Sequence, residues 1–285
     1  MKQALWLLLI ISLSPLAVSH AASTPQARLD HLWLRAHEGQ AQAQDALGAM
    51  YFFGFGVPQN DAKAYKWYRL AAEKGNAEAQ NNLGTMYFEG QGAPKNYAKA
   101  LKWWHLAAER GFAPAQDELG LLYYRGQGVL QNYVTADKWW HLAAEKGDAS
   151  AQFSLGAMYA TGHGVLKNEA KAYKWYRRAA EQGDAKAQLA LGAMYYLAAE
   201  RGDALAQSNL GRLYYEDMSV PQNYVAAYKW FLLSQADMSP TDPSYSALAG
   251  FMRAVRTRMM PSEIILAQQE AAAWEAAHPY AGPPH

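Results

Sequence analysis

The stretch FFGFGVPQNDAKAYKWYRLAAEKG, residues 52–75, combines two closely spaced glycines, an asparagine, a pair of aromatic residues and a final glycine. The same skeleton returns three times, as FEGQGAPKNYAKALKWWHLAAERG, YRGQGVLQNYVTADKWWHLAAEKG and ATGHGVLKNEAKAYKWYRRAAEQG. A glutamine recurs every thirty-six residues, at Gln44, Gln80, Gln116, Gln152 and Gln188. A fixed period of this length is typical of a solenoid, whose units bury their apolar faces only by stacking.

Each repeat unit has the apolar periodicity of two helices. In the first unit, the inward face of the first helix is predicted to carry Ala43, Leu47, Met50 and Tyr51. The inward face of the second helix is predicted to carry Ala64, Trp67, Tyr68, Ala71 and Ala72. Gly48 lies in the middle of the first helix, where glycine lowers helix stability by about 1 kcal/mol relative to alanine. Its recurrence indicates that a ring packs on the backbone there, either Trp67 or Tyr68.

The ends of the predicted helices carry capping residues. Asparagine precedes each second helix, at Asn60, Asn96, Asn132, Asn168 and Asn223. N-caps of first helices are predicted at Asn76, Asp148, Asp184 and Asp203. A glycine follows the second helices at Gly75, Gly111, Gly147, Gly183 and Gly202, as a left-handed C-terminal cap requires. Gly54 and Gly56 are expected to turn the chain through positive φ values.

The pattern AQxxLGxMYxxGxGVxxNxxKAxKWYxxAAExG resembles the Sel1-like repeat, a relative of the tetratricopeptide repeat. The resemblance implies an all-α fold, a right-handed superhelical α-solenoid of antiparallel helix pairs. It also implies that the first helices line the concave side. Proteins of this family commonly act as scaffolds in envelope assembly, secretion, signalling or host contact.

The repeat pattern predicts the following segments: a signal peptide over residues 1–21, an N-terminal capping helix over 22–42, four regular repeats over 43–183, a truncated repeat over 184–202, a divergent repeat over 203–238, C-terminal capping helices over 239–278 and a disordered tail over 279–285. The first C-terminal helix is expected to begin at Asp242 and Pro243, and the last at Pro261.

The truncated repeat lacks seventeen of the thirty-six residues, because Gln188 and Gln207 are only nineteen apart. We expect one continuous helix between Asp184 and Gly202, and a bend near Gly202 that divides the solenoid. The next unit has Asp217 and Ser219 where the turn glycines would stand.

The first residues are typical of an export signal. Lys2 gives a basic start, residues 4–13 are apolar, and Ala21 ends a small-residue cleavage motif. We predict cleavage after Ala21 and a periplasmic or secreted protein. The alternative is an uncleaved amphipathic cap helix.

Composition excludes several classes of function. The formal charge of +1 argues against nucleic acid or an acidic membrane surface as a partner. The absence of cysteine excludes disulfides, thiolate catalysis and cysteine-ligated metals. The apolar run in the leader is too short for stable membrane insertion.

No motif predicts a catalytic residue, a cofactor or a metal. His105 and His141 occupy equivalent positions without a carboxylate at ligand spacing, so we assign them to a solvated face. The glycine-rich turns follow helices and lack the Lys-Ser/Thr of a phosphate loop. Some cysteine-rich relatives have been described as binding or hydrolysing β-lactams. This chain has no cysteine and no Ser-x-x-Lys, so a β-lactam-related enzyme is the third hypothesis.

The face of the first helices opposite the inward residues is the candidate binding surface. It varies among copies, whereas the inward positions do not. The predicted groove residues are Asp45, Phe52, Asn81, Thr85, Phe88, Asp117, Leu121, Tyr124, Tyr196, Arg212 and Tyr215. Aromatic anchors beside polar groups suit a peptide or a glycan. The alternative is that these rings fill gaps between successive first helices.

These features predict an exported, non-enzymatic adaptor that binds a protein or peptide partner through its concave groove. A binder of cell-wall or exported polysaccharide is the second hypothesis. In the core, Trp103 is expected to belong to the layer between hairpins.

Overall fold

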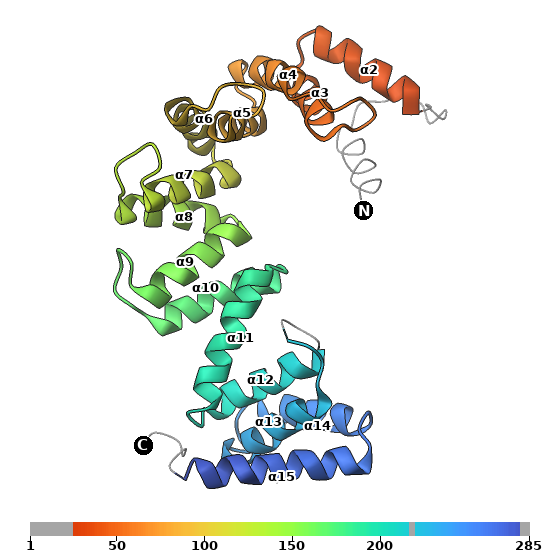
Figure 1. Cartoon of the computed structure of the whole chain (residues 1–285), viewed down its shortest axis with the longest axis vertical. Helices are drawn as coiled ribbons and strands as arrows, with labels where there is room; N and C mark the ends of the chain where they lie inside the picture. The colour runs from red at the N-terminus through yellow and green to blue at the C-terminus, as the bar shows by residue number, and fades with distance from the viewer. Residues whose placement is uncertain (1–24, 217–219, 280–285) are drawn as a thin grey trace. The chain divides into compact units, whose positions relative to one another are not determined.

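A computed structural model describes residues 25–216 and 220–279 of the chain. These residues form fourteen helices and no strand, and successive helices follow each other as hairpins (Figure 1). The helices are α2 (Pro25–His37), α3 (Ala41–Phe53), α4 (Asp61–Glu73), α5 (Ala77–Glu89), α6 (Tyr97–Glu109), α7 (Ala113–Arg125), α8 (Tyr133–Glu145), α9 (Ala149–Thr161), α10 (Glu169–Glu181), α11 (Ala185–Ala199), α12 (Ala204–Glu216), α13 (Tyr224–Asp237), α14 (Tyr245–Arg256) and α15 (Pro261–Ala277).

Three predictions lie outside the described residues: the signal peptide, the substituted turn positions at Asp217 and Ser219, and the tail from residue 280 onward. The N-terminal capping helix is α2, a single helix that precedes the first repeat.

The predicted caps are confirmed. The side chain of Asn60 accepts a hydrogen bond from the backbone N–H of Lys63 at 2.9 Å, which satisfies a donor at the start of α4. The equivalent bonds form at Asn96, Asn132, Asn168 and Asn223, and at the first-helix caps Asn76, Asp148, Asp184 and Asp203. Gly75, which follows α4, has φ 84°, a left-handed value that glycine adopts without strain.

The two helices of a hairpin meet where a glycine faces a ring. A Cβ at Gly48 would lie 2.5–2.9 Å from three ring atoms of Tyr68, so only glycine fits there. The same arrangement joins Gly84 to Trp104. The ring that faces the glycine is therefore the second of the aromatic pair. Trp103, predicted for the layer between hairpins, is half-buried and packs against the same core cluster as Trp104.

The recurring glutamine joins consecutive repeats. The buried side chain of Gln80 donates to the carbonyl of Ala72, near the end of the preceding second helix, at 3.1 Å. That carbonyl is among the last four of α4, which lack partners inside the helix. The same bond forms from Gln44, Gln116, Gln188 and Gln207, each to a carbonyl eight residues earlier.

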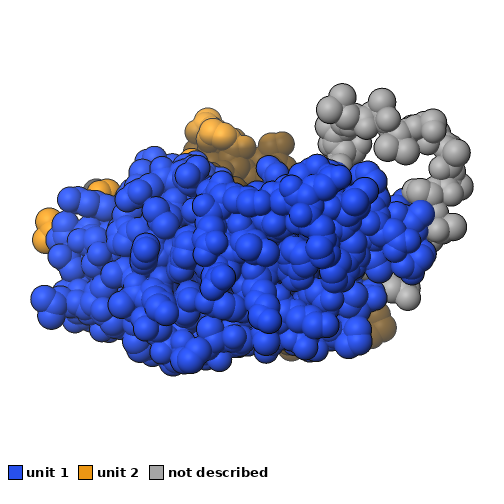
Figure 2. Space-filling view, turned by 90° about the horizontal axis from the view of Figure 1, so that it is seen from above, with its two compact units in different colours: residues 1–151 blue, residues 152–285 orange. Residues whose placement is uncertain are grey.

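The described chain divides into two compact units, residues 1–151 and 152–285, which are coloured separately in Figure 2. The bend predicted near Gly202 stays a prediction. The prediction of one helix in the shortened repeat is confirmed: α11 runs without a break from its N-cap Asp184 to Ala199, and Gly202 has φ 85°.

The C-terminal helices complete the second unit. Leu248 and Val255 of α14 are buried in one cluster with Phe231 of α13, which confirms that α14 covers an apolar edge. The predicted start of α14 is wrong. Asp242 instead accepts a hydrogen bond from the N–H of Ser244 at 2.7 Å, a local turn, and the helix begins at Tyr245.

Candidate partner-binding site

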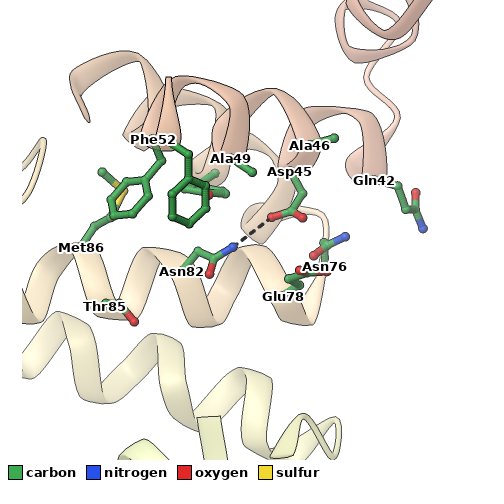
Figure 3. A pocket seen from close by; sticks show the side chains of 12 residues that line it. Gln42, Asp45, Ala46, Ala49, Phe52, Asn76, Glu78, Asn82, Thr85 and Met86 are labelled. Carbon is green, nitrogen blue, oxygen red and sulfur yellow. Dashed lines mark hydrogen bonds between the residues drawn. The ribbon is translucent and has the colours of Figure 1, made fainter. Parts of the chain in front are cut away.

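A hollow of about 520 Å³ lies between α3 and α5, the first helices of consecutive repeats (Figure 3). Its walls combine aromatic rings, two carboxyl groups and amides. The lining residues are Gln42, Asp45, Ala46, Ala49, Phe52, Phe53, Tyr68, Asn76, Glu78, Asn82, Thr85 and Met86. Its volume is within the range of small-ligand sites.

Asp45 is the most buried charged group of this hollow. Its side chain leaves α3 toward α5, and Asn82 Nδ2 donates to its Oδ1 at 3.4 Å (Figure 3). Burial, and then the negative charge of Glu78, raise the pKa of Asp45 to about 7, while the bond from Asn82 lowers it. Burial also raises the pKa of Tyr68 at the floor, and Asp45 and Glu78 add to that rise.

Asp117, two repeats further on, has the same electrostatic character. Burial raises its pKa to about 7, and the nearby carboxylates of Asp148 and Glu118 contribute. The indole of Trp140 opposes part of this rise. Burial also raises the pKa of Glu118. The first-helix face of the first unit therefore holds two aspartates, Asp45 and Asp117, whose pKa values are raised by burial.

Apart from Tyr196, the predicted aromatic residues of the first-helix face are half-buried and pack on neighbouring rings. Phe88 lies 5.4 Å from Trp104 and 5.3 Å from Tyr97, measured between ring centroids. Tyr124 packs in the same way on Trp140 and Tyr133, and Tyr215 packs on Tyr224 and Phe251. These rings thus have a structural contact within their own repeat, whereas Phe52 also lines the hollow.

The remaining predicted groove residues are spread over both units. Asp45, Phe52 and Thr85 line one hollow, and Leu121 is half-buried on α7. The backbone carbonyl of Asn81 accepts a hydrogen bond from Trp104 Nε1 at 3.2 Å. In the second unit, Tyr196 is 48% exposed, and Arg212 pairs with Glu216 at 3.5 Å.

The sequence analysis missed two residues of α5 that line the hollow, Glu78 and Asn82. Glu78 and Asn82 lie on α5, at the positions that correspond to Gln42 and Ala46 one repeat earlier. The predicted groove took a single row of residues from each first helix, whereas the hollow is lined by two adjacent rows on the facing sides of α3 and α5. Asn82 could have been predicted, because it directly follows the predicted groove residue Asn81 on the same helix.

The histidines are not on a solvated face. His105 is half-buried between the rings of Tyr123 and Trp139, and burial lowers its pKa. His141 Nδ1 lies 3.3 Å from a carboxylate oxygen of Asp137, four residues earlier, and this contact raises the pKa of His141. Among the described residues, no group of three or more potential ligands is placed to hold a metal. No described helix is long and apolar enough to span a membrane.

The geometry defines a class, the α-solenoid of stacked helical hairpins. The Sel1 repeat model matches residues 41–76, 77–112, 113–148, 149–184 and 204–234, more than half of the chain. The chain belongs to the Sel1 repeat family, whose solenoids are scaffolds typical of protein–protein interaction.

Two solved structures support this assignment. A protective antigen present in uropathogenic Escherichia coli strains, with an SLR fold, is 26% identical with a TM-score of 0.57. The alignment covers 90% of this chain and 65% of the antigen, so the chain spans less than two thirds of its length. A Sel1 repeat protein from Oxalobacter formigenes is 27% identical with a TM-score of 0.56, covering 90% of this chain and 94% of that one. No curated protein matches the chain.

Proposed function

We propose that this chain is an exported, non-catalytic adaptor that binds a protein or peptide partner across the faces of its first helices that are predicted to line the concave groove. The observation that carries the proposal is the contrast between two positions of the repeat. One is always a buried leucine: Leu47, Leu83, Leu119, Leu155 and Leu210. The other, two residues earlier, varies among the copies: Asp45, Asn81, Asp117, Phe153 and Ser208.

Copies of a repeat share their packing but not their ligand contacts. A position that differs among copies on a single face is therefore free to recognise different parts of one extended partner. The hollow between α3 and α5 supports the proposal, because it offers a partner a recess beside this face. The rings of Phe52 and Phe53 at its edge are anchors of the kind that dominate binding energy in protein interfaces.

The test is affinity capture from an envelope extract with the full chain and two matched variants. Thr85→Arg places a long charged side chain into the hollow, whereas Ala62→Arg places the same side chain on the exposed side of α4. We expect Thr85→Arg to lose a captured protein that the Ala62→Arg variant retains. Equal capture by both variants, or capture of a polysaccharide alone, would contradict the proposal.

Export is part of the proposal and is tested separately. The basic start, the apolar run and the small residues before Ala22 support it. Mass spectrometry of the protein recovered from cells should give an N-terminus at Ala22. A chain that retains Met1 or Lys2 would show that the segment is not removed.

A further inference from the structure

The charge of the hollow between α3 and α5 is one-sided. Its two ionisable acids are Asp45 and Glu78, and neither lysine, arginine nor histidine is among its lining residues. Asp45 is only 9% exposed. Within the described part of the chain, no cationic group lies within ion-pair distance of its carboxylate, although buried carboxylates in proteins are normally paired.

We propose that this hollow binds the cationic end of a lysine or arginine side chain of the partner. The inference rests on the proposed partner-binding function and specifies the chemistry that the first-helix face recognises.

The arrangement of the side chains suits such a group. Asn82 holds Oδ1 of Asp45 at 3.4 Å, which orients the carboxylate and leaves the second oxygen available to a donor (Figure 3). Glu78 extends from the first turn of α5 on the same side and adds a second negative charge (Figure 3). A cation entering between these groups is therefore attracted by both acids, of which only Asp45 is largely removed from water.

The aromatic edge of the hollow accommodates the apolar part of the partner's lysine or arginine side chain. The rings of Phe52 and Phe53 are perpendicular, with centroids 5.0 Å apart, and Met86 lies next to Phe52 (Figure 3). Lysine and arginine carry an apolar stem below the charged head, and the stem packs on apolar surface while the head remains with polar groups. The face of an aromatic ring also attracts the head directly.

Other ligand classes fit less well. An anion would be repelled by Asp45 and Glu78. A tightly bound divalent metal ion would need more ligands than these two carboxyl groups provide, and no cluster of three or more potential ligands occurs among the described residues. A purely apolar side chain would bury Asp45 further without a partner, which is unfavourable.

Binding of a cation should be coupled to the ionisation of Asp45. Burial and Glu78 raise its pKa to about 7 in the free protein, so near and below pH 7 the carboxyl must release its proton when a cation binds. The groups that face it are Glu78 and Asn82 from α5 and Tyr68 from α4. The affinity for a cation is therefore expected to fall by up to about tenfold per pH unit below pH 7.

The experiment is a titration of the isotope-labelled full chain, followed by the NMR signals of the Asn82 side-chain amide. The probes are arginine amide and N-acetyl-lysine N-methylamide, with the neutral N-acetyl-glutamine N-methylamide as the control ligand. We expect saturable shifts with both cations only, an affinity at least tenfold lower in Asp45→Asn, and a flatter pH dependence in that variant. Glu270→Gln removes an exposed acid on α15, outside the hollow and the first-helix face, and should leave these shifts intact.

Two results would overturn the inference: shifts with the neutral probe equal to those with the cations, or an unchanged affinity in Asp45→Asn. If Asp45→Asn does not fold, Glu78→Gln replaces it and should weaken binding several-fold; an unchanged affinity in that variant overturns the inference as well.

Panning a random peptide library on the full chain separates this inference from the proposed function. Peptides enriched in lysine or arginine that lose binding to Asp45→Asn support both. Peptides that bind without cationic enrichment support a peptide-binding adaptor and overturn the cation site. Saturable cation shifts without any bound peptide support the site and argue against peptide binding.

Discussion

Replacing Gly84 by alanine tests how tightly the hairpins are packed. In an exposed helix interior this change is stabilising by about 1 kcal/mol, because alanine is the better helix former. At Gly84 the new Cβ would lie 2.7, 2.7 and 3.0 Å from three ring atoms of Trp104. The ring is 1% exposed and cannot move into solvent.

The magnitude follows from two opposing effects. Overpacking of this kind costs about 1–3 kcal/mol, and contacts below 3 Å with an immobile ring place Gly84→Ala at the upper end. After the propensity gain, we expect a net loss of about 1–2 kcal/mol in the free energy of unfolding. Gly250 is the matched control, since it lies within α14 and a Cβ there would meet nothing within 4 Å. Gly250→Ala should stabilise the chain by up to about 1 kcal/mol.

The assay is urea unfolding followed by circular dichroism and by tryptophan fluorescence. Because solenoids can unfold in steps, the α5–α6 hairpin is also followed by hydrogen exchange. A Gly84→Ala variant as stable as the Gly250→Ala variant would refute the reasoning. As a further check, Trp104→Leu should reduce the cost of Gly84→Ala, with a coupling energy of about 0.5–3 kcal/mol.

Three further outcomes are expected. Trp104→Ala should cost about 3–5 kcal/mol as a core truncation, and Trp103→Ala distinctly less, measured by urea unfolding of both variants. The pKa of Asp45 is about 7 in the folded chain and about 3.9 when unfolded, so the folded state holds the proton more tightly between these values. The protonated carboxyl of Asp45 therefore contributes fully to the free energy of unfolding below about pH 4, and this contribution is lost as the pH rises to 7. Asp45→Asn should be more stable than wild type by about 2–4 kcal/mol at pH 8 and nearly equal to it at pH 4. Hydrogen exchange over residues 196–203 should be faster than in α8, because Tyr196 and Leu197 are 48% and 58% exposed at the end of the shortened repeat.

The contrary results are equally specific. Equal losses for the two tryptophan variants would mean that both rings share the core. A stability gain in Asp45→Asn that does not change with pH would mean that folding leaves the pKa of the carboxyl unchanged. Uniform protection from α8 to residue 203 would mean that the shortened repeat is packed as firmly as the regular ones.

The hairpins, their period and their ends were determined by the sequence, because the signals are local. The side chain of Asn60 accepts a hydrogen bond from the backbone N–H of Lys63, three residues further along the chain, and Gly75 adopts a left-handed conformation that other residues avoid. Such signals act within one turn of backbone and repeat in every copy. For the same reason the single helix α11 could be predicted from the residues that its repeat lacks.

The choice between neighbouring side chains was decided only by the tertiary structure. Trp103 and Trp104 are both apolar and adjacent, so periodicity does not say which ring occupies the core; the missing Cβ of Gly84, on another helix, makes room for Trp104. The hollow also depends on stacking, since Asp45 and Asn82 are thirty-seven residues apart and meet only when α3 packs beside α5. The raised pKa of Asp45 then arises from burial, which no single helix provides.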